Sequence, residues 1–259
     1  MRQGGEGRGG RLALRVAVGL LLIALLAAGW LYRTYQGFLE TPLAVADEGL
    51  VFEVRRGQSL KGVARALAAQ GVLERPRFLV WLGISRGVAG RIQAGEYRIE
   101  PGTRPGDLLQ RLVDGKVLLH PLTIVEGWTF AQMRAHLARQ PFLRHTLEGA
   151  SPEVVMQRIG RPGIHPEGRF LPDTYHFPRG TSDVECLKRA YAAMESFLAE
   201  AWAERDPGLP LETPYEALIL ASIIEKETAV PEERPLIAGV FVRRLQRGMR
   251  LQTDPTVIY

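Results

Sequence analysis

Val51-Phe-Glu-Val-Arg-Arg-Gly-Gln-Ser-Leu60 is the segment from which the architecture of this chain follows. Its first six residues form a short alternating pattern, which predicts a half-buried strand. The next segment, 60–69, has apolar residues at helical spacing and predicts an amphipathic helix. Gly57 suits the turn between the two, and Ser59 suits the cap at the N-terminus of the helix. The segment therefore predicts a strand, a turn and a helix in direct succession.

The same order recurs twice, each time with a glycine and a threonine between strand and helix. The second copy comprises 97–99, Gly102, Thr103 and 105–113, and the third comprises 122–125, Gly127, Thr129 and 130–139. A further helix around Leu79 and a closing strand at 95–99 complete a βααβ unit of roughly fifty residues. This unit resembles a LysM module, a small carbohydrate-binding fold, and a generic α+β unit is the alternative. The fold class that we predict is α+β.

The segment Leu12–Tyr32 is the most hydrophobic of the chain, and 16–31 contains no charged residue. Its length suffices for a membrane span of ~20 residues, and Trp30 and Tyr32 suit an aromatic belt at its end. Arginines precede it, so the positive-inside rule leaves residues 1–11 as a cytoplasmic tail. A cleavable signal peptide is the alternative, although the apolar core is long and Ala27-Ala28-Gly29 is a weak cleavage site. We expect an uncleaved anchor followed by a linker at 33–48.

Composition narrows the functional classes. The net charge is +5, of which +3 lies in residues 1–15, so the remaining 244 residues carry only +2 and form no basic stripe. A nucleic-acid partner is therefore not expected. The five histidines are scattered and Cys186 is the only cysteine, so we expect no metal site and no intrachain disulfide. No other cofactor is expected either. Cys186 lies in an amphipathic helix, where we expect it to be packed.

Two carboxylates end a well-marked helix near the C-terminus, in Ala221-Ser-Ile-Ile-Glu-Lys-Glu-Thr-Ala-Val230. The helix is predicted to begin at a capping box of Thr213 and Glu216, with a proline at its first position. Glu227 follows the apolar stripe of this helix, and a carboxylate that is partly desolvated is suited to act as a general acid. Glu225 lies about 200° around the helix from it. Catalytic work is one interpretation of the pair, and an exposed helix end is the other.

Two further segments precede this helix. Residues 140–182 are rich in prolines and predict loops. Within them, 166–178 gathers aromatic and polar side chains that suit a sugar groove or, alternatively, pack into the core. A capping box of Ser182 and Glu185 then begins a long helix.

These motifs together resemble a known family. Ala221–Val230, the segment Val240-Phe-Val-Arg-Arg-Leu-x-x-Gly-Met-Arg-Leu-Gln-Thr-Asp-Pro-Thr-Val-Ile-Tyr259 and the segment Glu167-Gly…Leu-Pro-Asp-Thr-Tyr175 are similar to the MltG (YceG-like) endolytic murein transglycosylases. The resemblance implies a LysM-like subdomain at 49–120 and a catalytic domain at 121–259. Family members continue past the last motif, so it also implies that the catalytic domain is incomplete at Tyr259.

The resemblance implies a membrane-anchored enzyme of the inner (plasma) membrane that cuts nascent peptidoglycan glycan strands internally. The expected bond joins N-acetylmuramic acid (MurNAc) to N-acetylglucosamine (GlcNAc), and the expected product ends in 1,6-anhydroMurNAc. The family's catalytic glutamate corresponds to Glu227, as general acid and base. Substrate contacts are expected from Glu225, Thr228, Asp173, Tyr175, Gln252, Thr253, Asp254 and Tyr259. Peptidoglycan synthases are the expected protein partners. The alternatives are a muramidase and a non-enzymatic peptidoglycan-binding scaffold.

Overall fold

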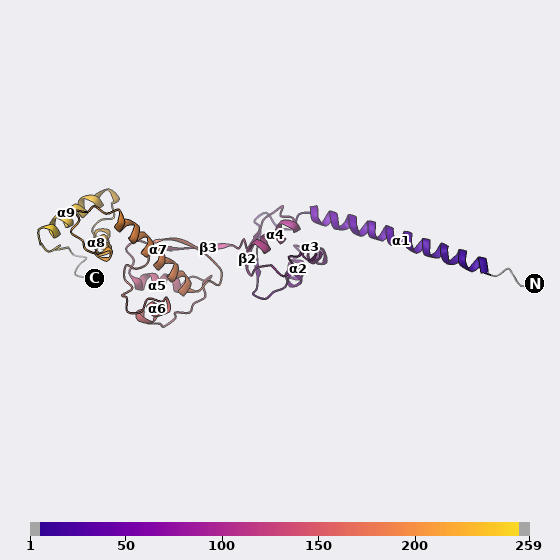
Figure 1. The fold of residues 1–259 in the computed structure, drawn as a ribbon, viewed down its shortest axis with the longest axis horizontal. Helices are drawn as coiled ribbons and strands as arrows, with labels where there is room; N and C mark the ends of the chain where they lie inside the picture. The colour runs from indigo at the N-terminus through magenta and orange to yellow at the C-terminus, as the bar shows by residue number, and fades with distance from the viewer. Residues whose placement is uncertain (1–5, 254–259) are drawn as a thin grey trace, which may run out of the picture. The chain divides into compact units, whose positions relative to one another are not determined.

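The computed structural model describes the backbone of residues 6–253 and side chains from Leu14 onward. The chain divides into two compact units, Met1–Leu118 and Leu119–Tyr259, and Figure 1 follows the chain through both. Helices and antiparallel strands occur in both units, so the mixed α and β architecture is confirmed.

Within residues 6–118, the first unit contains one two-stranded antiparallel sheet and four helices. The elements in chain order are α1 (Glu6–Glu40), β1 (Leu50–Val54), α2 (Leu60–Ala69), α3 (Pro76–Ser85), β2 (Gly95–Ile99) and α4 (Pro105–Asp114). Strands β1 and β2 pair from Leu50↔Ile99 to Val54↔Gly95. Leu67, Leu79 and Leu112 pack from α2, α3 and α4 into one core with the inward side chains of the strands. The βααβ order is confirmed, while its relation to LysM stays a prediction.

Local chemistry accounts for the start of α2. Gly57 adopts a φ of +78°, which suits a residue without a side chain. The Ser59 hydroxyl accepts a hydrogen bond from the Gly62 amide at 3.2 Å and so satisfies one of the free N–H groups of the first turn. By analogy with Ser59, Thr103 was expected to cap the helix that follows it, and this prediction is wrong. Arg104 is the N-cap of α4 because Pro105 occupies its first position, and the Thr103 hydroxyl donates to the Glu100 carbonyl instead.

Helix α1 is longer than the predicted span and ends inside the first unit. Its segment Leu14–Glu40 is long and apolar enough to cross a membrane. Beyond Tyr32, however, Tyr35, Phe38 and Leu39 pack against the core of the unit. The segment expected as a linker at 33–48 is thus helical up to Glu40 and partly packed, because these three apolar side chains gain burial by continuing the helix onto the domain.

The second unit is built on a sheet of two strands that are distant in sequence. Its elements are β3 (Leu119–Ile124), α5 (Phe130–Ala138), α6 (Pro152–Arg158), β4 (Asp173–Pro178), α7 (Asp183–Ala203), α8 (Pro214–Glu227), the 3₁₀ helix η1 (Pro231–Glu233) and α9 (Arg234–Gln246). Strands β3 and β4 pair from Leu119↔Pro178 to Ile124↔Asp173. Both α6 and β4 lie in the region that the sequence predicted to be loops.

Helix α7 begins where predicted, at a capping box of Ser182 and Glu185. Asp183 beside it is buried, and its carboxylate accepts hydrogen bonds from the Thr146 hydroxyl and from the Thr146, Leu147 and Val184 amides. Burial alone would raise the pKa of Asp183, but these hydrogen bonds outweigh it and lower the pKa. The buried carboxylate thereby ties the 144–147 loop to the start of α7.

Helices α8 and α9 carry a small core of their own. Leu220, Ile223 and Phe241 are its buried members, and partly buried apolar side chains from both helices surround them. The Thr213 hydroxyl caps α8 by accepting from the Glu216 amide, as predicted. The reciprocal half of the capping box is wrong, because the Glu216 carboxylate accepts from the Glu212 amide rather than from Thr213.

Candidate active site

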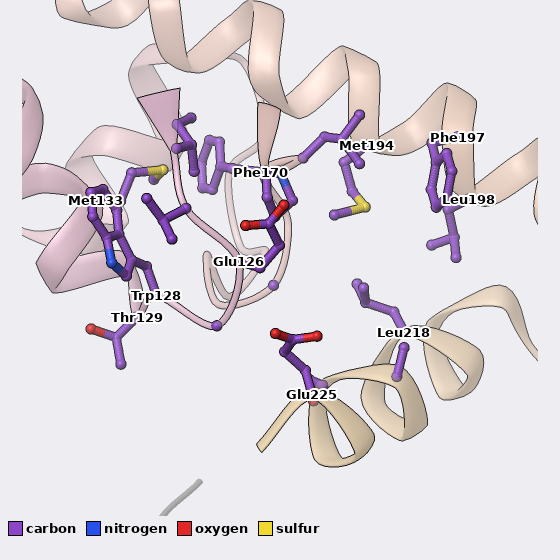
Figure 2. Close-up of a pocket in the computed structure, with 18 of the residues that line it drawn as sticks. Glu126, Trp128, Thr129, Met133, Phe170, Met194, Phe197, Leu198, Leu218 and Glu225 are labelled. Carbon is purple, nitrogen blue, oxygen red and sulfur yellow. The ribbon is translucent and has the colours of Figure 1, made fainter. Parts of the chain in front are cut away.

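A cavity of about 610 Å³ opens in the second unit between α7, α8 and two loops. Its lining is mostly apolar, and Figure 2 shows the carboxylates of Glu126 and Glu225 among these side chains. Helix α7 contributes Met194, Phe197 and Leu198, while the β3–α5 loop contributes Glu126 and Trp128. Pockets of this size with a few polar groups are typical of sites for small molecules or parts of polymers. The cavity is therefore the candidate active site.

The end of α8 is attached directly to the β3–α5 loop. The Lys226 ammonium donates to the Gly127 carbonyl at 2.6 Å. Gly127 has a φ of +70°, and a side chain at this position would lie 3.4 Å from the Lys226 nitrogen and 3.7 Å from a Glu225 carbon. Glycine at 127 thus suits the positive φ of the turn after β3, and a methyl group there would be in ordinary van der Waals contact with the end of α8. The predicted turn glycine of the third strand–helix copy becomes part of the cavity wall.

A second loop, residues 166–172, is fixed to the start of α5 by Glu167. Its carboxylate accepts a hydrogen bond from the Phe130 amide at 2.8 Å, while Thr129 and Gln132 form the local capping box. Phe130 is the first residue of the helix, so its N–H has no partner within the helix. A negative charge is also favourable at this end of the helix dipole. Glu167 therefore holds the loop that supplies Gly168, Phe170 and Pro172 to the cavity.

Glu225 faces the cavity, whereas Glu227 does not line it. The side chains of Leu218, Ala221, Ser222 and Glu225 form the cavity-facing stripe of α8. Figure 2 shows the Glu225 carboxylate across the opening from that of Glu126. Glu225 is 29% exposed, and its carboxylate forms an ion pair with Arg234 at 2.9 Å. The cavity lining thus includes two carboxylates and a guanidinium, of which Glu225 and Arg234 form an ion pair.

Glu227 occupies the last position of α8 and is exposed. The sequence predicted that the Glu227 carboxylate would be partly desolvated at the end of the apolar stripe. In the structure, the Glu227 side chain is exposed to solvent instead. The reason is that, on α8, the small core shared with α9 ends at Ile224, and no later residue of the helix belongs to it. Glu227 lies about 200° around the helix from Glu225, so the two carboxylates face different surroundings.

Thr228 ends α8 and is buried. Its hydroxyl donates to the Glu233 carboxylate at 2.7 Å and accepts from the Val230 amide at 3.0 Å. These bonds connect the end of α8 to η1, which leads directly into α9 and Arg234. The predicted substrate contact thus has its hydroxyl engaged within the protein, where it holds the break between the two helices.

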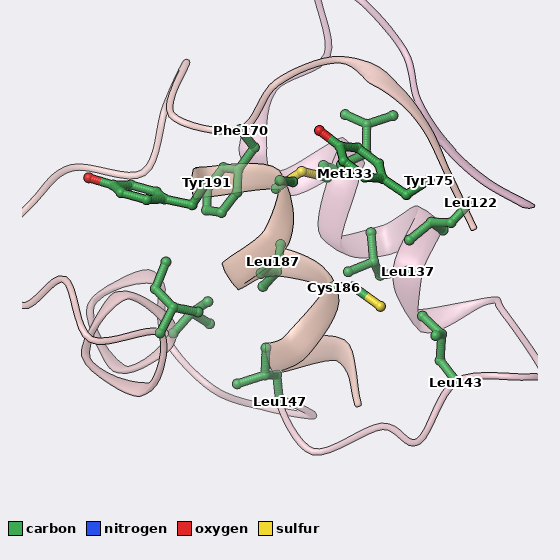
Figure 3. Close-up of a cluster of buried hydrophobic side chains, with 14 of the residues drawn as sticks. Leu122, Met133, Leu137, Leu143, Leu147, Phe170, Tyr175, Cys186, Leu187 and Tyr191 are labelled. Atoms are coloured by element: carbon green, nitrogen blue, oxygen red, sulfur yellow. The ribbon is translucent and has the colours of Figure 1, made fainter. Parts of the chain in front are cut away.

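Tyr175 lies in the core and not at a surface groove. Figure 3 shows it among the buried side chains that surround Leu187 and Cys186. It is 5% exposed, its hydroxyl donates to the Leu171 carbonyl, and burial raises its pKa to about 12. Of the two interpretations of the 166–178 segment, packing into the core is the one that applies to Tyr175. Asp173 begins the same strand, is exposed and accepts from the Thr174 amide.

The remaining predicted contacts lie at the C-terminal end. Gln252 is exposed and has a φ of +48°, a left-handed conformation, while Thr253 is buried. Neither lines the cavity. Asp254 and Tyr259 lie outside the described residues. Burial raises the pKa of Cys186 to about 12, in accord with the packed position predicted for it.

Sequence reasoning missed Glu126 and Arg234. Glu126 directly follows β3 in the turn that precedes α5, a place where a rigid scaffold commonly presents functional side chains. That position was a usable signal. No sequence signal indicated Arg234, because its ion pair with Glu225 depends on the path of the chain through η1. Among residues 6–253 no cluster of three or more histidine, cysteine or acidic side chains that could hold a metal ion occurs.

Comparisons with known proteins agree with one another. The protein named endolytic murein transglycosylase of Bacillus subtilis (strain 168) is 27% identical over 220 residues, which cover 78% of this chain and 61% of the relative. A protein of the same name from Streptococcus pneumoniae serotype 2 (strain D39 / NCTC 7466) is 26% identical over 275 residues, which cover 93% of this chain and 48% of the relative. The chain thus spans about half to three-fifths of the length of these relatives.

A crystal structure described as that of a YceG-like protein from Listeria monocytogenes is also similar. It is 27% identical to this chain, with a TM-score of 0.41, and the match covers 83% of this chain and 76% of that one. The sequence profile of the YceG-like family matches residues 52–259. Because this match includes most of the chain and the whole of α8 with Glu225 and Glu227, the chain belongs to the YceG-like family.

Proposed function

We propose that this chain belongs to a membrane-anchored lytic transglycosylase that cuts peptidoglycan glycan strands internally. The observation that carries this proposal is the position of α8. The helix that bears the family motif places Glu225 in the wall of an open, largely apolar cavity, and Glu227 follows two residues later at the exposed end of the helix. Relatives that share the motif region are named endolytic murein transglycosylases. A helix of this kind, with acids beside a cavity, is suited to glycoside cleavage.

The composition of the cavity suits a sugar polymer. Apolar and aromatic side chains such as Trp128, Phe170 and Phe197 can pack against the apolar faces of pyranose rings. Glu126, Glu225 and Arg234, which also line the cavity, can bind hydroxyl and amide groups. The cavity is open to the surface, as an enzyme that cuts inside a long strand requires.

The proposed reaction cleaves the bond between MurNAc and GlcNAc with Glu227 as general acid and base. A protonated Glu227 donates its proton to the glycosidic oxygen, so GlcNAc leaves with a new hydroxyl. The positive charge that develops at C1 of MurNAc is stabilised by the acetamido group of the substrate. The Glu227 carboxylate then takes the proton of the C6 hydroxyl, and this oxygen bonds to C1. The products are the GlcNAc end and a 1,6-anhydroMurNAc end, with no water consumed. One acid/base suffices in such substrate-assisted cleavage.

Glu225 is the second candidate for the acid. Its place in the cavity favours it, but its carboxylate is paired with Arg234, and a guanidinium binds the ionised form of a carboxylate. As an acid, Glu225 would first have to leave this ion pair. Exposed Glu227 carries no such constraint, and its correspondence to the catalytic glutamate of the family supports it. We therefore assign to Glu225 and Arg234 the binding and orientation of substrate.

The other proposed contacts follow from their positions. Thr228 holds the end of α8 that carries Glu227. Asp173 is proposed to bind the strand beyond the cavity, and Tyr175 to support β4 from the core. Gln252, Thr253, Asp254 and Tyr259 belong to the second family motif and are proposed to complete the groove.

We further propose that α1 crosses the inner (plasma) membrane once, with its N-terminus in the cytoplasm. Residues 33–259 then lie outside, where nascent peptidoglycan is exposed, and peptidoglycan synthases are the proposed partners. The apolar segment Leu14–Glu40 and the arginines before it support this orientation.

Digestion of purified sacculi tests the proposal. The full-length protein is compared with its Glu227→Gln and Glu225→Gln variants, and mass spectrometry detects the muropeptides. We expect anhydro-muropeptides from the parent, none from Glu227→Gln and reduced amounts from Glu225→Gln. Unchanged anhydro product from Glu227→Gln would refute the assignment of the acid.

The same experiment distinguishes the alternative functions. Products heavier by one water, with reducing ends, indicate a muramidase. Glycan strands that bind to the parent and to Glu227→Gln without any cleavage indicate a scaffold that binds peptidoglycan.

A further inference from the structure

Helix α3 presents apolar side chains on both of its faces. Leu79, Leu82 and Gly83 are buried against the core of the first unit. On the opposite side, Trp81 is 52% exposed and Ile84 is 61% exposed, while Phe78 is half-buried between them and α1. A surface helix normally turns polar side chains outward. A second apolar face on a short surface helix indicates contact with something else.

The orientation of α3 is set by tight packing, so the outward face cannot turn inward. A side chain at Gly83 would lie 2.2 Å from a Leu60 methyl carbon of α2. The two helices therefore approach as closely as their side chains permit at this point. With this contact in place, Trp81 and Ile84 remain on the outer side of the unit.

Four aromatic rings attach this face to the base of the proposed membrane span. Tyr35 of α1 lies edge-on to Phe78 and Trp81 of α3, with ring centroids 5.5 Å and 6.0 Å apart. Phe38 of α1 also meets Phe78 edge-on at 5.6 Å. Because α1 is one continuous helix, α3 is held at a fixed height along it. The aromatic cluster of Tyr35, Phe38, Phe78 and Trp81 thus links the span to the domain.

Helix geometry gives that height. Residues 12–32 rise about 30 Å, which matches the thickness of a bilayer hydrocarbon core. Tyr32 would then mark its edge, and Tyr35 lies about 5 Å further along the helix axis. The headgroup layer extends about 5–8 Å beyond the hydrocarbon. The Trp81 ring packs beside Tyr35 and consequently lies at the level of the lipid headgroups, where tryptophan is favoured in membrane proteins.

The charges around this face complement an anionic surface. Residues 33–40 and 74–86 contain four arginines and two glutamates, a net charge of +2. All four arginines are exposed: Arg33, Arg75, Arg77 and Arg86. Basic side chains close to a membrane are attracted to acidic lipids.

We propose that α3 is a membrane-surface helix: Trp81 and Ile84 insert into the headgroup layer of an anionic bilayer, and the flanking arginines bind lipid phosphates. This inference rests on the proposed crossing of the membrane by α1. It assigns to the first unit a second attachment to the bilayer, so that this unit lies against the membrane surface and does not move freely on a tether.

Spin labels in nanodiscs test this contact on the full chain. Single Trp81→Cys and Ile84→Cys variants are labelled in discs that contain one part anionic to two parts zwitterionic lipid. Native Cys186 is buried and stays in place, and the unsubstituted chain gives the background. The matched control is Val51→Cys, since Val51 is an apolar side chain of the same unit with 48% exposure. Accessibility to oxygen, which concentrates in lipid, is compared with accessibility to a water-soluble nickel complex.

We expect the oxygen-to-nickel ratio at residues 81 and 84 to exceed that at residue 51 by about fivefold or more. Replacing the anionic lipid by zwitterionic lipid should reduce the difference, because each arginine near the surface contributes roughly a fivefold preference. Ratios at 81 and 84 equal to that at 51 would overturn the proposal. Dipolar broadening between labels at residue 81 would overturn it as well, because it indicates a second copy on this face.

A label at Leu22→Cys separates this inference from the proposed anchor. If residue 22 is shielded from nickel while 81 and 84 are open to it, α1 spans the membrane and only the surface contact fails. If residue 22 is itself open to nickel, the span fails. The thermal unfolding of each labelled variant is measured too, and the Ile84 position keeps the test valid if replacement of Trp81 disturbs the aromatic cluster.

Discussion

The hydrogen bond from the Phe130 amide to Glu167 should control the order of one wall of the cavity. The donor and acceptor are 2.8 Å apart, the acceptor is charged, and the amide is the first of α5. A hydrogen bond to a charged group contributes about 1.5–3 kcal/mol, which partial exposure of Glu167 reduces to about 1–2 kcal/mol. Glu167→Ala should lose this amount. Glu167→Gln keeps a carbonyl acceptor and should lose only about 0.5 kcal/mol, the interaction of its charge with the helix dipole.

Hydrogen exchange at the Phe130 amide measures this loss directly. A cost of 1–2 kcal/mol corresponds to exchange that is about 5 to 30 times faster in Glu167→Ala. The 166–172 backbone should also exchange faster, and sacculus cleavage should fall, because Gly168, Phe170 and Pro172 line the cavity. Glu148→Ala is the matched control, since it removes an exposed carboxylate from the same unit. Equal Phe130 exchange in Glu167→Ala, the control and the parent would refute the reasoning.

Three further predictions concern the second unit. Asp183→Asn should cost about 3 kcal/mol or more in urea unfolding, since a buried amide cannot accept all four hydrogen bonds. Because folding lowers the pKa of Asp183, the stability that its carboxylate contributes is present above about pH 4 and is lost as the pH falls further. The Asp183→Asn variant should not show this loss of stability in acid. An identical dependence of unfolding on acid pH in parent and variant would contradict the prediction. Gly127→Ala and Gly149→Ala should destabilise to a similar extent, because both glycines have positive φ and the neighbours of Gly127, at 3.4 Å or more, leave room for a methyl group; a much larger shift of the urea midpoint for Gly127→Ala would contradict this. Cys186 should not react with a thiol reagent at pH 8 until the protein unfolds, because burial raises its pKa to about 12, and rapid labelling of the native protein would disprove this.

Local signals predicted individual elements well. The helices at 60–69 and 214–227 and the capping box of Ser182 depend on side chains within a few residues of one another. Thr103 shows how such signals fail: Pro105 moved the cap by one residue. Strand β4 shows a different failure. Its residues pair with β3 about fifty positions earlier, and a proline-rich segment carries no local sign of that partner.

At the candidate site, too, local sequence predicted some features and tertiary contacts decided the others. The helical period alone placed Glu225 and Glu227 on different sides of α8, because residues two apart are about 200° apart on any helix. Which side faces the cavity was settled by the packing of Leu220 and Ile223 against Phe241 of α9, together with the Lys226 contact to Gly127. Tyr175 was likewise placed inward by the pairing of β4. Periodicity separates the faces of a helix or strand, but only contacts with elements distant in sequence select the face that each partner covers.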